Sequence, residues 1–263
     1  MIKMATAFSY SATGNTFLVF DNRELALDPN DVKKWNQLAI KHHVDGIIFL
    51  QKSDGFDYEM VYLNADGHKE VMCGNGMRTL GQFAFLQLGL KPGADHCYKV
   101  KTANGVYRVR PLDPLSVEMS EIFDEQKIVV SDLYSPAKKS FYINTGVPHT
   151  IFEVDEVKSL DLAKIAPPIR HDKRFEKGSN VNFFKIIGFN EVELRTFERG
   201  VEGETKSCGT GATATALACA RLLGWTERVR LNTPGGILDV TFDENFKNVW
   251  LSGAVTLVGQ ITF

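Results

Sequence analysis

The sequence of 263 residues has little of several features that mark particular classes of protein. Its four cysteines, Cys73, Cys97, Cys208 and Cys219, are too few and too scattered for a disulfide-stabilised scaffold. No apolar run reaches the length of a membrane span, and residues 1–17 lack the unbroken apolar core of a secretory signal. We therefore expect a reduced, cytoplasmic protein that does not bind a membrane.

An excess of charge of one sign is also missing. The 30 Lys and Arg residues nearly balance the 32 Asp and Glu residues, so nothing in the charge indicates a nucleic-acid partner. Basic clusters such as KKSF at 138–141 and DKRFEK at 172–177 are interpreted as solvated surface. No Cys-x-x-Cys or paired His-Cys spacing predicts zinc or thioredoxin-type chemistry, and no Lys-Ser/Thr follows the glycines as in a P-loop.

Two segments of the sequence repeat one arrangement. Residues 73–89 read CGNGMRTLGQFAFLQLG, and residues 208–224 read CGTGATATALACARLLG. Each begins Cys-Gly-polar-Gly, continues as an apolar run and ends Leu-Gly, which predicts a helix of about four turns that a glycine terminates. Downstream, residues 100–109 and 231–240 both indicate a strand, a turn and a second strand.

The repeat predicts two similar β-rich units, each with one long central helix. Gly, Asp and Asn turns separate the predicted strands, which argues against a doubly wound βαβ fold. We place the boundary at 111–127, where Pro and acidic residues gather. The first domain is expected to be 1–118, joined by a C-terminal strand at 250–263, and the second to be 119–249. Further strands are expected at residues 46–51, 57–63, 141–146, 150–154, 182–187 and 192–197.

The two repeated cysteines stand where thiol chemistry is favoured. A thiol at a helix N-terminus lies near unpaired N–H groups and the positive end of the dipole, which lower its pKa from about 8.5 toward neutrality. Two such thiols from pseudo-symmetric halves would face each other across a cleft, where one removes an α-proton and the other returns one to the opposite face. A structural disulfide between Cys73 and Cys208 is an alternative. For Cys97 and Cys219 we expect packing roles.

Longer stretches around both cysteines resemble a known family. Residues 64–78 (NADGHKEVMCGNGMR) and 198–214 (ERGVEGETKSCGTGATA) resemble the two signature segments of the diaminopimelate epimerases. TGNTF at 13–17, VPH at 147–149 and GSNVNFF at 178–184 follow the family's order and spacing, so the resemblance covers nearly the whole chain.

This resemblance implies a fold, an activity and a mode of assembly. The implied fold class is α+β, with two pseudo-symmetric domains, each a mostly antiparallel β-layer wrapped around a central helix. The family interconverts L,L- and meso-diaminopimelate on the bacterial route to lysine and peptidoglycan and uses no cofactor. Its members often form dimers, so we expect a homodimer. The expected substrate is a small amino acid.

The resemblance also implies roles for individual residues. Cys73 and Cys208 match the catalytic pair, and His149 matches a histidine that adjusts the proton affinity of a cysteine. Glu198 would contact the substrate ammonium and help set a thiol's protonation, and Arg199 would pair with the distal carboxylate. No metal ligand is implied. The other expected substrate-binding residues are Asn15, Asn64, Gly74, Asn75, Asn180, Gly209 and Thr210, four of which offer N–H groups at helix starts that suit a carboxylate.

These polar residues also have simpler interpretations. Asn15 and Asn64 are typical turn residues, His149 could satisfy a backbone carbonyl, and Glu198 with Arg199 could form a surface ion pair.

Three positions depart from the family pattern: Thr16 stands where Asp is usual, His68 where Ser is frequent, and Val147 where Asn is common. A polar contact is therefore missing at Val147, and Asn144 is a candidate substitute. A racemase of another amino acid on the same scaffold stays an alternative, as does a non-catalytic binding protein.

Overall fold

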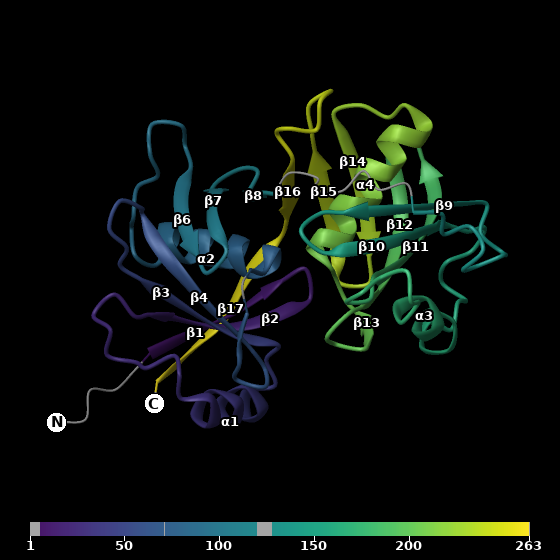
Figure 1. Ribbon diagram of the computed structural model, residues 1–263. Helices are drawn as coiled ribbons and strands as arrows, with labels where there is room; N and C mark the ends of the chain where they lie inside the picture. The colour runs from purple at the N-terminus through teal and green to yellow at the C-terminus, as the bar shows by residue number, and fades with distance from the viewer. Residues whose placement is uncertain (1–5, 71, 120–127, 263) are drawn as a thin grey trace. The chain divides into compact units, whose positions relative to one another are not determined.

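The computed structural model describes residues 6–70, 72–119 and 128–262 (Figure 1). The chain divides into two compact units, which are Met1–Glu118 with Ser252–Phe263, and Met119–Leu251. The expected boundary segment falls in part on residues 120–127, which lie outside the described residues.

Unit 1 contains two helices among its strands. In chain order its elements are β1 (Thr6–Ala12), β2 (Asn15–Asp21), α1 (Val32–His42), β3 (Gly46–Gln51), β4 (Tyr58–Asn64), β5 (Lys69–Glu70), α2 (Gly74–Leu86), β6 (Tyr98–Thr102), β7 (Gly105–Arg110), β8 (Ser116–Glu118) and, from the C-terminal end, β17 (Val255–Thr262). β17 pairs antiparallel with β1.

Unit 2 repeats this order. Its elements are β9 (Lys139–Asn144), β10 (Pro148–Glu153), α3 (Leu162–Arg170), β11 (Asn180–Gly188), β12 (Glu191–Glu198), β13 (Gly203–Thr205), α4 (Gly209–Leu223), β14 (Arg228–Thr233) and β15 (Gly236–Thr241), followed by β16 (Trp250–Gly253), which spans the division between the units.

The strand pairings repeat as well. Most are antiparallel, as expected. The two parallel pairings of unit 1, β2 with β3 and β4 with β6, correspond to β10 with β11 and β12 with β14 in unit 2. Because a parallel pairing needs a crossover connection, each one marks where a helix enters the unit. The predicted duplication and the α+β fold class are therefore confirmed.

The predicted strands were found where the sequence indicated them. The six isolated segments correspond to β3, β4, β9, β10, β11 and β12, and the two repeated hairpins to β6–β7 and β14–β15. The expectation of one helix per unit was incomplete, because α1 and α3 were not predicted. Both begin after an aspartate whose side chain accepts from a backbone N–H three residues on, Asp31 from Lys34 and Asp161 from Lys164.

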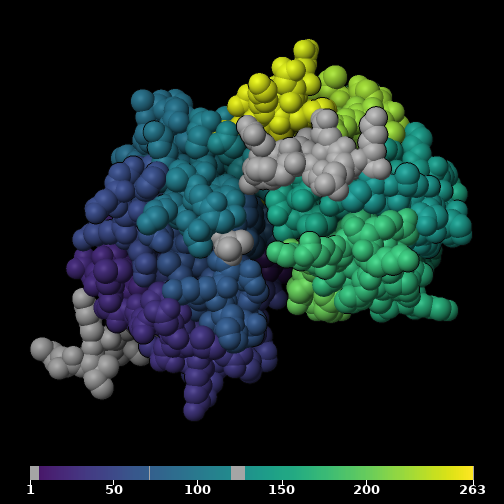
Figure 2. Space-filling model, viewed as in Figure 1, coloured from purple at the N-terminus to yellow at the C-terminus, as the bar shows by residue number. Residues whose placement is uncertain are grey.

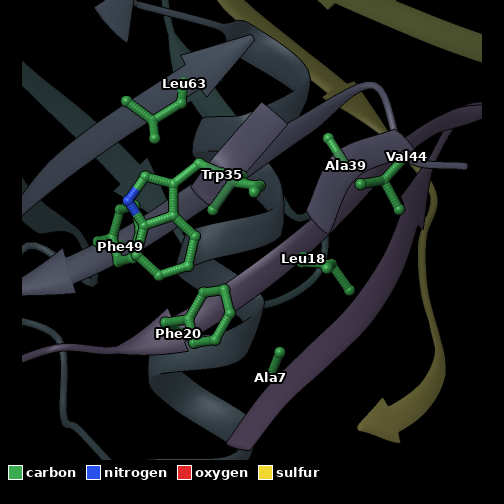
Figure 3. Packing of buried hydrophobic residues seen from close by; sticks show 9 residues of the cluster. Ala7, Leu18, Phe20, Trp35, Ala39, Val44, Phe49 and Leu63 are labelled. Atoms are coloured by element: carbon green, nitrogen blue, oxygen red, sulfur yellow. The ribbon is translucent and has the colours of Figure 1, made fainter. Parts of the chain in front are cut away.

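A buried aromatic cluster holds α1 against the sheet of unit 1 (Figure 3). The rings of Phe20 and Phe49 stack with centroids 5.4 Å apart, and Trp35 from α1 meets Phe49 edge-on at 4.8 Å. Unit 2 has an equivalent pair in the corresponding strands β10 and β11, where the rings of Phe152 and Phe183 also stack with centroids 5.4 Å apart. Figure 2 shows the opposite, exposed side of α1 on the surface of unit 1.

The two central helices are buried on nearly every side, as expected of a helix without a polar face. α2 contacts β1, β2, β3, β4, β7, β8 and β17 of its own unit, and α4 contacts β9, β10, β11, β14 and β15 (Figure 1). Gly224 terminates α4 in a left-handed conformation, as predicted. Gly89 does not terminate α2, because the helix already ends at Leu86. Beyond that residue, the N–H groups of Leu88 and Leu90 bond to carbonyls five and six residues earlier in place of four. Within the described residues, no helix is both long and apolar enough to cross a membrane.

Candidate active site

Cys73 is the residue that caps the N-terminus of α2. Its backbone is extended, with φ −139°, and its sulfur accepts a hydrogen bond from the N–H of Gly76 at 3.4 Å. Gly76 packs closely here, because a methyl group in its place would lie 3.1 Å from Ile48 and 3.4 Å from Cβ of Cys73 and would fit only if Ile48 shifted. The sulfur is thus held against the first helical turn, where the dipole favours a thiolate.

A hydrogen-bonded network of side chains surrounds Cys73. The sulfur lies 3.9 Å from Oδ1 of Asn15, and the same oxygen accepts from Nδ2 of Asn75 at 3.3 Å. Oδ1 of Asn75 accepts from Arg78 at 2.6 Å, and Arg78 also donates to Thr13 at 3.1 Å. Arg78 is fully buried, which lowers its pKa to about 10, while the charge of Cys73 opposes that shift.

Asn64, at the end of β4, is not part of this network. Its Oδ1 accepts from the hydroxyl of Tyr62 at 2.8 Å, and its Nδ2 donates to Glu70 at 3.1 Å. Its backbone closes the turn to His68, whose side chain is exposed beside Asp66. Of the expected residues of unit 1, Asn15, Cys73, Gly74 and Asn75 are therefore brought together, and Asn64 belongs to a neighbouring network.

Cys208 occupies the equivalent position at the start of α4 but in a different environment. Its sulfur lies 3.5 Å from Oγ1 of Thr210. Burial, followed by the negative charge of Glu198, raises the pKa of the Cys208 thiol well above its usual range. The pKa of Glu198 is itself raised by burial, although its hydrogen bond to Cys208 acts in the opposite direction. This environment favours a protonated Cys208.

Asn180 connects the backbone on either side of this region. Its Oδ1 accepts from the N–H of Arg199 at 2.7 Å, and its Nδ2 donates to the carbonyl of Pro148 at 3.3 Å. The guanidinium of Arg199 donates to the carbonyl of Lys177 at 3.3 Å. Asn180 thus fixes the turn that presents Arg199.

His149 is buried on β10, in register with Asn180 on β11. Its Nδ1 lies 3.0 Å from Nδ2 of Asn182, while its Nε2 has no hydrogen-bond partner among the described residues. Burial, followed by the positive charge of Arg199, lowers the pKa of His149 to about 3. The ring is therefore neutral at physiological pH.

Sequence reasoning did not single out Arg78 and Asn182, which contact the expected residues, or Thr196, which contacts Asn182. Each carried a signal that could have found it. Arg78 interrupts an apolar helical run five residues after Cys73, and Asn182 and Thr196 fall at buried positions of apolar strands. A polar side chain in such a position needs a hydrogen-bond partner, so it indicates a network. The expected packing role of Cys97 and Cys219 agrees with their burial.

The architecture defines a class of proteins built from two related units around buried helices. A phenazine biosynthesis protein of the PhzF family from Bacillus anthracis matches 100% of the chain and 99% of its own length, with a TM-score of 0.69 and 14% identity. A probable proline racemase from Agrobacterium radiobacter matches 98% of the chain and 92% of its own length, with a TM-score of 0.69 and 14% identity. At these identities the likeness concerns the fold alone.

Sequence comparison is more specific. The diaminopimelate epimerase family model matches residues 141–258. A diaminopimelate epimerase of Methanocella arvoryzae is 39% identical over 248 residues, which are 87% of the chain and 86% of that relative. One of Flavobacterium psychrophilum is 32% identical over 97% of the chain and 98% of that relative. The chain belongs to the diaminopimelate epimerase family and is an isomerase.

Proposed function

We propose that this chain interconverts the L,L and meso stereoisomers of diaminopimelate by two-base proton transfer at the α-carbon. One feature supports this mechanism above all others: in each unit, a cysteine stands at the N-terminus of the buried central helix. A sulfur in that position can exchange a proton with a carbon acid while the helix N–H groups favour the anionic form.

Cys73 and Cys208 are proposed as the base and the acid. The Cys73 thiolate forms an S–H bond with the α-proton, and the electron pair of the broken C–H bond moves into the substrate carboxylate. The Cys208 thiol then protonates the opposite face of the carbon and is left as a thiolate. The protonated state that burial and Glu198 favour for Cys208 supports this direction. The reverse reaction exchanges the two roles.

Backbone groups at the helix starts are proposed to stabilise the developing negative charge. The N–H groups of Gly74 and Asn75 begin α2, and those of Gly209 and Thr210 begin α4. An α-helix leaves its first N–H groups without intrahelical acceptors, so they suit a carboxylate whose charge grows in the transition state.

The remaining expected residues are proposed to hold the two ends of the substrate. Glu198 is a carboxylate beside Cys208 and suits the ammonium of the reacting centre. The half-buried Arg199 carries a guanidinium that suits the distal carboxylate, which a planar fork binds best. Asn15, Asn64 and Asn180 are proposed as amide contacts.

Asn144 is proposed to supply the polar contact that Val147 does not offer. It is the last residue of β9, opposite Pro148, and its Oδ1 is buried with no hydrogen-bond partner among the described residues. A buried acceptor in this condition is suited to a substrate N–H. Replacing Asn144 by Leu should raise KM for diaminopimelate more than it lowers kcat, and an unchanged KM would exclude this contact.

Proton NMR in heavy water tests the function directly. Purified protein is incubated with L,L-diaminopimelate, proline, glutamate and alanine in separate samples, and the α-proton signal of each is followed. Loss of that signal for diaminopimelate alone, with formation of the meso isomer, is the expected result. Exchange of another amino acid instead would favour a racemase of that substrate, and exchange of none would favour a binding protein.

We also propose that the enzyme acts in the cytoplasm as a homodimer, in keeping with a biosynthetic role in the lysine route. Light scattering of the purified protein at micromolar concentration should give twice the mass of the 29.4 kDa chain. A mass equal to that of one chain at micromolar concentration would contradict this assembly.

A further inference from the structure

The side-chain amide of Asn182 joins His149 to the interior of unit 2. Asn182 is fully buried on β11, which pairs with the strand that carries His149. Its Nδ2 lies 3.0 Å from Nδ1 of His149 and 3.0 Å from the carbonyl oxygen of Thr150. Its Oδ1 lies 2.9 Å from the hydroxyl of Thr196.

These contacts fix the direction of every hydrogen bond in the group. A backbone carbonyl can only accept, so the amide atom that faces Thr150 is the nitrogen. The oxygen then faces Thr196, whose hydroxyl donates to it. Because the amide nitrogen can only donate, Nδ1 of His149 must present its lone pair, and the neutral ring carries its proton on Nε2.

That proton has no acceptor in the described part of the chain. Nε2 of His149 is buried and unpartnered there. Buried N–H groups without an acceptor are rare in folded proteins, so the missing acceptor is expected to arrive with a ligand. The amide also lies close to Cys208, since a methyl group on Gly211 would stand 2.5 Å from Oδ1 of Asn182 and 3.3 Å from the cysteine sulfur.

We propose that Asn182 is a positioning residue that holds His149 as the Nε2–H tautomer, so that His149 donates a hydrogen bond to the bound amino acid and does not act as a base. The identity of the acceptor rests on the proposed function, whereas the tautomer does not. An imidazole whose only lone pair is already engaged by an amide cannot take up the α-proton.

Nitrogen NMR on protein labelled with 15N-histidine tests the tautomer without any substrate. The six histidines are resolved by two-bond proton–nitrogen correlations, and the His149 pattern is assigned by its loss in His149→Gln. Nε2 should resonate as a protonated nitrogen and Nδ1 as an unprotonated one, unchanged from pH 8 to pH 6. A proton on Nδ1 in the wild-type protein would overturn the proposal.

A substitution at Asn182 tests its cause. Asn182→Asp places an acceptor-only group against Nδ1, so the proton should move to Nδ1 or the ring should become doubly protonated. Asn245→Asp is the matched control, because Asn245 is exposed in the same unit, and it should leave the pattern unchanged. An unchanged pattern in a folded Asn182→Asp protein would show that Asn182 does not set the tautomer. If that variant does not fold, the wild-type spectrum still decides whether His149 is a donor.

Replacements of His149 separate a donor from a base. The side-chain amide of Gln can place an N–H near the position of Nε2, so His149→Gln should keep kcat/KM within about tenfold of wild type, whereas His149→Ala should lose about 100-fold or more, as for removal of one positioned donor. Equal losses in both folded variants would contradict the donor role. The expected NMR pattern in a protein that exchanges no amino-acid proton would leave the tautomer supported and the proposed function refuted.

Discussion

Nη2 of Arg78 lies 2.6 Å from Oδ1 of Asn75, within the first turns of the central helix of unit 1. A guanidinium can only donate, so this bond fixes the amide of Asn75 and turns its Nδ2 toward Asn15. Oδ1 of Asn15 is then directed to the sulfur of Cys73. One buried arginine therefore determines how two asparagines face a cysteine.

Replacing Arg78 by Met tests whether the arginine positions the asparagines beside Cys73 or only supports the fold. The substitution removes the donor that orients the amide of Asn75 and, through it, Asn15, so we expect kcat/KM for diaminopimelate to fall about 100-fold, as misplaced contacts commonly cause. Arg78→Lys should not restore full activity, because an ammonium cannot reproduce the planar fork. The α-proton exchange rate measures the effect, and circular dichroism checks the fold. Arg23→Met, at a half-exposed arginine paired with Asp21 in the same unit, is the control and should keep full activity. Full activity in Arg78→Met would show that the arginine is only structural.

Each repeated cysteine should be indispensable. Cys73→Ala and Cys208→Ala each remove one of the two proton carriers, and we expect epimerisation to fall by about 1,000-fold or more, within the range for loss of acid–base catalysis. Cys219→Ala is a matched control, because Cys219 lies on the same helix as Cys208 and is buried among alanines. It should retain activity close to wild type. Undiminished turnover in either of the first two variants would refute the two-base mechanism.

Glu198 should slow the alkylation of Cys208. The carboxylate raises the pKa of the thiol after burial has already done so, and only the thiolate reacts with iodoacetamide. Glu198→Gln removes the charge, and the rate at pH 8 should rise by about tenfold for each pKa unit recovered. Mass spectrometry of the Cys208 peptide gives the rate. Glu244→Gln, at an exposed position of the same unit, is the control. A rate in Glu198→Gln equal to or below that of wild type would contradict this role.

The buried neutral His149 should make folding stability depend on pH. Its pKa falls from 6.5 to about 3 on folding, so between these values only the unfolded chain binds the proton. The contribution of His149 to the free energy of unfolding is therefore fully present above pH 6.5 and is lost as the pH falls toward 3. At pH 4.5 the loss should be about 2–3 kcal/mol, at about 1.4 kcal/mol per pKa unit. Urea unfolding at pH 7 and pH 4.5 measures it. The drop in the free energy of unfolding should be smaller in His149→Gln by that amount, and equal drops in both proteins would be inconsistent with a neutral buried ring.

Local signals in the sequence were sufficient for most secondary structure. Apolar runs between Gly, Asp and Asn turns located β3 and β11, and the Cys-Gly-x-Gly starts located α2 and α4. Helix α3 was missed because Pro167 and Pro168 lie inside it, in an amphipathic segment that only packing against the sheet makes helical. Gly89 misled the prediction of where α2 ends, because the nearest glycine is not always the one at which the hydrogen bonds stop.

The sequence alone determined the duplication and the positions of Cys73 and Cys208 at helix starts, since both follow from residue spacing and local backbone preference. Its motifs also resembled the family to which the relatives show that the chain belongs. Only the tertiary structure decided what surrounds each cysteine. Asn15 lies beside Cys73 although the two residues are 58 positions apart in the chain, and burial makes Cys208 a protonated thiol beside Glu198. Protonation and hydrogen-bond direction depend on solvent exclusion and on partners distant in the chain, and neither is encoded in spacing.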